Sequence, residues 1–181
     1  ALVLGAPVYY GDISGLTKSF MDSVRISNSN GKPALGYAIA GGSGKGLLSG
    51  VQSIYHFFYH RQMRGVDPTP VSRFNMAQAK TLLRESGGKL VELADSIAPF
   101  PGEKRGDRWA DVLAYYAALP YFGAGPVDEF MMLAEQLIRI SEGPEVAEAQ
   151  AEFDQALALI GEGHRSRAAA HAVRAYERLY F

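Results

Sequence analysis

The sequence predicts an α/β fold followed by a helical extension. Two apolar runs, residues 1–4 and 34–40, have the composition of buried strands in a parallel sheet. Each run is followed by a glycine-containing loop and then by apolar residues at helical spacing. Units of strand, loop and helix build open parallel sheets, which bind ligands at the carboxyl ends of their strands. Beyond about residue 98 every apolar pattern is helical.

The first unit combines a strand, a turn and a capped helix. The unbroken apolar run 1–4 predicts a strand that is covered on both faces. Gly5, Pro7 and Gly11 predict that the chain turns directly after this strand. Ser14 is expected to cap the following helix. The apolar positions of that helix are Leu16, Phe20, Met21 and Val24.

The next elements continue the alternation. A strand over 34–40 is expected to lead into a helix from about 46 to 63. Residues 66–72 contain two prolines, which predicts a strand at the edge of the sheet. Asn75 is expected to cap a helix over 76–97, and a pair of glycines inside that helix should weaken or kink it.

The last part of the chain is predicted to be helical after a linker at 98–107. The expected helices cover 108–119, 127–142, 145–160 and 164–180. The last two should pair as a hairpin, because residues 142–163 contain six acids and no Lys or Arg, whereas 165–178 contain four arginines and one acid. We expect this hairpin to have a structural or oligomeric role.

Composition narrows the function classes. The net charge of −1 gives no support to nucleic-acid binding, and no apolar run approaches the roughly 18 residues of a membrane-spanning helix. The absence of cysteine excludes disulfides and thiol chemistry in this chain. Residues 1–98 contain ten Lys and Arg against six acids, so this half of the chain is mildly basic. A basic surface favours phosphate-bearing ligands, but a difference this small is equally typical of ordinary surface variation. We expect a cytoplasmic protein.

One ordered set of residues carries a family resemblance. The pattern P-x-Y-x-G-x-x-x-G-x-x-K-x-F-x-D follows the first strand, and PALGYAIAGGSGKG follows it at residues 33–46. Together they resemble the third and fourth strands, with their loops, of the flavodoxin-like NAD(P)H-dependent FMN reductase and quinone reductase family. The resemblance covers about residues 1–98. It implies a parallel three-layer sandwich, FMN as cofactor and NAD(P)H as co-substrate.

The resemblance implies two flavin-binding loops. The first consists of Pro7, Val8, Tyr9, Tyr10, Gly11 and Asp12, and the second of Gly41, Gly42, Ser43, Gly44, Lys45 and Gly46. In the family these loops contact the isoalloxazine ring. The residue types suit that role, because a flat apolar ring needs an aromatic partner and its polar edge needs backbone donors. The alternatives are a plain turn with its tyrosines in the core and a flexible loop without ligand. A triphosphate-binding loop is discounted, because Ile39 and Gly46 replace two of its defining residues.

Other candidate sites have simpler interpretations. His56 and His60 have a spacing that can bind metal, but no third ligand is in view, so a core or interface role is favoured. Lys18 and Asp22 are expected to form a solvated helical pair. His164 and His171 lie in the final hairpin and are predicted to be surface residues without partners. No catalytic side chain is predicted, since in flavin reductases the cofactor carries the hydride chemistry.

The chain begins inside a strand, so we expect a fragment that lacks the first strands and the phosphate loop of a longer protein. Residues 1–98 are interpreted as a partial FMN-binding domain and residues 107–181 as an α-helical extension. The predicted function is hydride transfer from NAD(P)H through FMN to a quinone, flavin or other small-molecule electron acceptor, in a homo-oligomer. A flavodoxin-type electron carrier, or a non-catalytic protein whose extension mediates interactions, are the alternatives.

Overall fold

A mixed, largely parallel sheet forms the centre of the protein. The computed structural model describes residues 1–96 and 98–180. Its strands are β1 (Leu2–Tyr9), β2 (Asp12–Ile13), β3 (Pro33–Ala40), β4 (Arg64–Gly65) and β5 (Thr69–Ser72). Their order is β2-β1-β3-β4, and β5 also pairs with β3. Only β2 is antiparallel to its neighbour among the described pairs. The proline-containing β5 lies at the sheet edge, as predicted.

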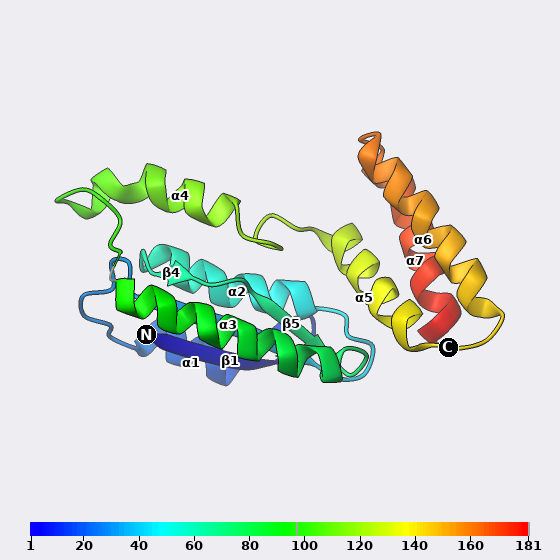
Figure 1. Ribbon diagram of the computed structural model, residues 1–181, viewed down its shortest axis with the longest axis horizontal. Coiled ribbons are helices and arrows are strands. Elements are labelled where there is room, and N and C mark those ends of the chain that lie inside the picture. The colour runs from blue at the N-terminus through cyan, green and yellow to red at the C-terminus, as the bar shows by residue number, and fades with distance from the viewer. Residues whose placement is uncertain (97, 181) are drawn as a thin grey trace.

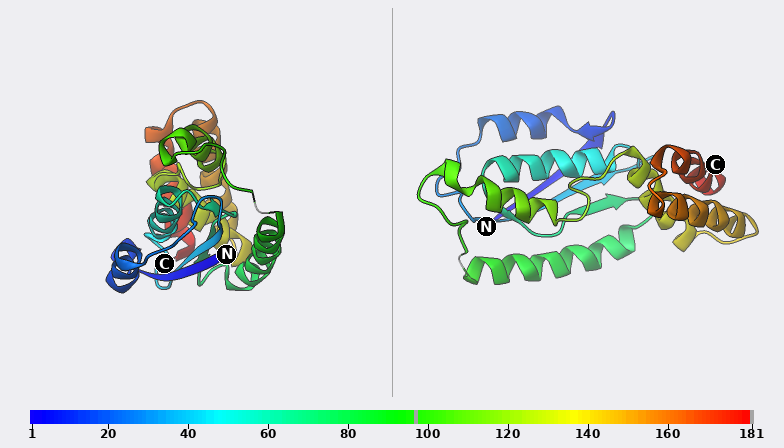
Figure 2. Two further views of the ribbon diagram at one scale, coloured as in Figure 1. Left: turned by 90° about the vertical axis from the view of Figure 1, so that its left-hand side faces the viewer. Right: turned by 90° about the horizontal axis from the view of Figure 1, so that it is seen from above.

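Helices cover the sheet and extend beyond it (Figure 1). They are α1 (Gly15–Ser23), α2 (Leu47–His60), α3 (Met76–Ser96), α4 (Trp109–Ala117), α5 (Pro126–Ile140), α6 (Glu145–Gly161) and α7 (Arg165–Tyr180). Figure 2 shows α2 and α3 on opposite faces of the sheet. The fold class is confirmed as flavodoxin-like α/β with a helical extension. The third helix was predicted to end at Ile97 and the extension at Phe181, and both residues lie outside the described part of the chain.

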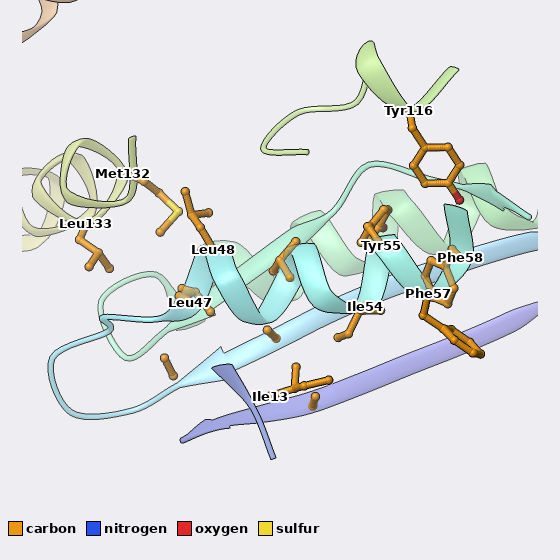
Figure 3. Packing of buried hydrophobic residues seen from close by; sticks show 14 of the residues in the cluster. Ile13, Leu47, Leu48, Ile54, Tyr55, Phe57, Phe58, Tyr116, Met132 and Leu133 are labelled. Atoms are coloured by element: carbon orange, nitrogen blue, oxygen red, sulfur yellow. The ribbon is translucent and has the colours of Figure 1, made fainter. Parts of the chain in front are cut away.

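Helix α2 forms the centre of the main core (Figure 3). Gly36 on β3 allows this helix to approach closely, because a Cβ at that position would lie 2.5 Å from the Tyr55 ring. Tyr55 is fully buried and donates its hydroxyl hydrogen to the carbonyl of Val66 at 2.5 Å. Burial raises the pKa of Tyr55, so the hydroxyl stays protonated and keeps donating.

Helix α4 packs on the side of α2 that faces away from the sheet (Figure 1). The buried Tyr116 donates to the carbonyl of Met63 at 2.9 Å, and Tyr115 donates to that of Gly65 at 2.7 Å. Gln52 of α2 donates to the carbonyls of the α4–α5 connection. Residues from both sides of the predicted linker therefore share one core, and the division into residues 1–98 and 107–181 stays a prediction.

Strand β1 differs from its prediction in length and in burial. It continues through Gly5 and Pro7 to Tyr9, where a turn was expected. Pro7 fits because its carbonyl accepts the Ser14 N–H at 3.0 Å on the side away from β3, so the missing N–H of proline does not face β3. The strand is not covered on both faces, since Val3 is 54% exposed. The main contacts of α3 with the sheet are made to β3 and β5.

Two predicted caps have different outcomes. Ser14 does cap α1, because its side chain accepts the Thr17 N–H at 3.3 Å. Asn75 does not cap α3 with its side chain, which instead accepts the Ser72 N–H at 2.8 Å and donates to Pro70. It therefore closes the turn after β5. The two glycines in α3 do not interrupt the helix.

Helices α6 and α7 form the predicted hairpin with the predicted charge pairing. Arg178 pairs with Glu148, and Arg174 lies 3.0 Å from Glu152. His171 was expected to lack a partner, but its Nδ1 lies 2.6 Å from the carboxylate of Glu152, which only the pairing of the helices brings within reach. None of the helices in the described part of the chain has the length and apolar character needed to cross a membrane.

Candidate functional site

The two predicted loops meet at the carboxyl edge of the sheet. Residues 7–12 include the end of β1, and residues 41–46 connect β3 to α2. Gly46 has a φ of +86°, and a Cβ at this position would lie 2.3 Å from the Cα of Gly11. The two backbones are therefore in direct contact, and only glycine fits at the crossing.

The first loop presents two aromatic rings to solvent. Tyr9 is 66% exposed and Tyr10 is fully exposed. Tyr10 also has a φ of +49°, a strained conformation for tyrosine that arises because the chain reverses between β1 and β2. The alternative of a plain turn with tyrosines in the core does not describe these side chains. The exposed rings of Tyr9 and Tyr10 can therefore stack on a flat ligand.

Two other members of the first loop fix it in place. Asp12 accepts hydrogen bonds from the Ile13 N–H and from the Ser53 hydroxyl, both at 2.7 Å. Val8 packs toward α2, where a Cβ at Gly50 would lie 2.8 Å from it. These side chains fasten the first loop to α2.

The glycine-rich loop offers backbone donors. A turn closed by the bond from Gly44 N–H to Gly41 O, at 2.9 Å, exposes Gly41 and Gly42. The N–H groups of Gly42 and Ser43 have no acceptor within the part of the chain that the structure describes. These two amides are the loop's free donors toward a polar ligand edge.

The start of α2, where a helix ordinarily has unpaired N–H groups, is occupied by a carboxylate. Glu129 of α5 accepts the Gly46 N–H at 3.0 Å with one oxygen and the Leu48 N–H at 2.9 Å with the other. A negative charge here is favourable, because the N-terminus of a helix carries unpaired N–H groups and a partial positive charge. No local pattern indicates this contact, because it joins residues more than 80 positions apart.

Helix α7 also touches the glycine-rich loop. Tyr176 donates to the carbonyl of Ser43 at 2.8 Å, and burial raises the pKa of Tyr176 to about 12, which keeps the donor protonated. The ammonium of Lys45 lies 5.2 Å from the ring centres of Phe130 and Tyr176. Lys45, predicted as a ligand-binding residue, is thus held by the extension through cation–π contacts.

A cavity of about 350 Å³ lies beside the first loop, between α1 and α2. Its walls include Asp12, His56 and His60, together with the exposed ion pair of Lys18 and Asp22 that the helical spacing predicted. Desolvation and the neighbouring His60 lower the pKa of His56. No group of three metal-ligating side chains occurs in the described residues.

Comparison with known proteins bears on these two loops. The model of the NADPH-dependent FMN reductase family matches residues 1–79. This match confirms the family resemblance and contains both loops, although it covers less than half of the chain. It supports NAD(P)H-dependent FMN reductase activity in general, with FMN and NAD(P)H as cofactors. No curated protein and no solved structure gives a significant match.

Proposed function

We propose that this protein is an FMN-dependent oxidoreductase that passes a hydride from NAD(P)H through bound flavin to a quinone, a flavin or another small acceptor. The observation that carries the proposal is the meeting of two family-matched loops at one sheet edge, with Gly46 against Gly11. Ligands of open α/β sheets bind at this edge. We also propose a cytoplasmic homo-oligomer.

The residues present fit a flavin ring. Tyr9 and Tyr10 supply exposed aromatic faces, and the free N–H groups of Gly42 and Ser43 suit the carbonyl and nitrogen acceptors of the pyrimidine edge. Pro7 limits the backbone freedom of the first loop. Bound FMN would supply the hydride-accepting N5 atom, so the chain itself need only bind and orient.

Helices α5 and α7 of the extension contact the glycine-rich loop of this site. Glu129 and Tyr176 hold the glycine-rich loop through its amides and a carbonyl, respectively. A loop held in this way has less conformational freedom to lose when a ligand binds. We therefore propose that α5 and α7 preorganise the flavin loop.

Titration of the protein with FMN, followed by flavin fluorescence, tests the proposal. We expect saturable quenching, with the affinity for FMN weakened about fivefold in Tyr10→Ala or Tyr9→Ala, since stacking on an aromatic ring contributes about 1 kcal/mol. Phe20→Ala is the matched control, because Phe20 is a half-exposed ring on α1 outside both loops. The rate of NADPH oxidation with a quinone acceptor should likewise fall in the two tyrosine variants and stay unchanged in Phe20→Ala.

The opposite result is equally informative. If the protein does not quench FMN fluorescence, or if all three variants bind like the wild type, the flavin site is not where we propose it. The similarity to the family would then be one of fold, and the helical extension would be the part to test for protein interactions.

A further inference from the structure

We infer that a second ligand site, for a phosphate group, lies at the opposite end of the sheet from the two loops. A cavity of about 470 Å³ opens there between the 26–30 loop, the end of α2 and the segment 99–108. Three arginines line it: Arg61, Arg105 and Arg108. This volume falls within the range of small-molecule sites.

The positive charge of these arginines is not neutralised. None of the three has a carboxylate within ion-pair distance in residues 1–96 and 98–180. Asp107, which adjoins Arg108 in sequence, accepts the Lys104 N–H at 3.0 Å instead. Three unpaired guanidinium groups around one cavity repel one another, and a bound anion relieves that repulsion.

Each guanidinium is nevertheless held in position by neutral groups. Arg61 donates to the carbonyl of Val24 at 3.1 Å, and Arg105 donates to that of His60. Arg108 donates to two carbonyls of its own loop, at 2.9 and 3.0 Å. These bonds use one or two of the five N–H groups that each arginine carries, so the rest remain for a ligand.

Aromatic rings restrict two of the arginines further. The guanidinium of Arg61 lies 5.3 Å from the ring centre of Phe57, and that of Arg105 lies 5.7 Å from that of Trp109. Stacked guanidinium groups lose little freedom when they bind. The site is therefore preorganised and not a chance meeting of mobile surface cations.

The chemistry favours a phosphate group. Planar guanidinium forks match phosphate oxygens, and three of them can each engage one terminal oxygen of a monoester. Asn28 and Ser29 add neutral polar groups at the rim. The chain as a whole has a net charge of −1, so this is a local feature and not a broad basic surface for nucleic acid.

The site is separate from the proposed flavin loops. The 26–30 loop that lines the cavity precedes β3 in the chain. The proposed flavin loops instead follow β1 and β3 (Figure 1). The eight residues of β3 span about 26 Å at about 3.3 Å per residue. A ligand here would therefore bind independently of the flavin ring.

Calorimetric titration of the protein with inorganic phosphate and with glycerol 3-phosphate, in chloride buffer, tests the inference. We expect saturable binding that is weakened at least tenfold in Arg105→Gln and in Arg108→Gln. Arg167→Gln is the matched control, because Arg167 is an exposed arginine on α7 without an ion pair among the described residues. Tighter binding of the ester would identify a phosphorylated metabolite as ligand, and tighter binding of inorganic phosphate would identify the free ion.

Folding and flavin binding provide the controls. Arg61→Lys keeps the positive charge but lacks the paired N–H donors of the guanidinium group. It should therefore weaken phosphate binding, while its Tm stays close to that of the wild type. FMN quenching should be unchanged in Arg105→Gln and Arg108→Gln. Absence of saturable binding to either probe, equal weakening in Arg167→Gln, or loss of FMN binding in the cavity variants would overturn the inference.

Discussion

Removal of the Glu129 carboxylate is the sharpest test of how the extension supports the glycine-rich loop. In Glu129→Ala, the Gly46 and Leu48 N–H groups lose the acceptors that now lie 3.0 and 2.9 Å away. A hydrogen bond to a charged group contributes about 1.5–3 kcal/mol. Glu129 is partly exposed, so water replaces some of the loss, and we expect about 2 kcal/mol in total.

Thermal unfolding measures this loss. For a chain of this size, 1 kcal/mol corresponds to about 2–4 °C in Tm, so Glu129→Ala should unfold about 4–8 °C below the wild type. Glu129→Gln keeps one acceptor oxygen and should lose about half as much. Glu135→Ala is the matched control on the same helix, since its exposed pair with Arg139 contributes only about 0–1 kcal/mol.

The refuting result is specific. If Glu129→Ala and Glu135→Ala unfold within about 1 °C of each other, about 0.5 kcal/mol or less separates them, and the carboxylate does not hold the start of α2. The inference that the extension preorganises the loop would then fail, whatever the outcome of the flavin titration.

Three further outcomes are expected. Gly46→Ala should weaken FMN quenching and cost about 1–3 kcal/mol, because its Cβ would meet the backbone of the first loop at a positive φ. Tyr116→Phe should lower Tm by about 2–4 °C, because the bond to the Met63 carbonyl at 2.9 Å is worth about 1 kcal/mol. Partial burial acts to raise the pKa of Asp128, but the Arg165 guanidinium and a backbone N–H outweigh it and lower the pKa. The stabilisation by Asp128 is therefore complete above the ordinary Asp pKa of about 3.9 and is lost as pH falls through the lowered value, so the Tm gap to Asp128→Asn, measured by pH-dependent melting, should close in acid.

The sequence alone determined the order and type of most elements. Apolar spacing, turn residues and charge segregation act over a few neighbouring positions, so they predicted the helices of the extension, the edge position of β5 and the pairing of α6 with α7. The motif spacing was enough to indicate the resemblance to the FMN reductase family and to propose both loops, whereas the contact between Gly11 and Gly46 appears only in the tertiary structure.

Only the tertiary structure decided what surrounds those elements. Helix α3 makes its main contacts with β3 and β5, while Val3 of β1 stays exposed. Asn75 closes the β5 turn because the Ser72 N–H lies within reach of its side chain. The partners of the glycine-rich loop, Glu129 and Tyr176, lie more than 80 and 130 positions away from it. Contacts of that range depend on how whole helices pack, and no local pattern in the sequence encodes them.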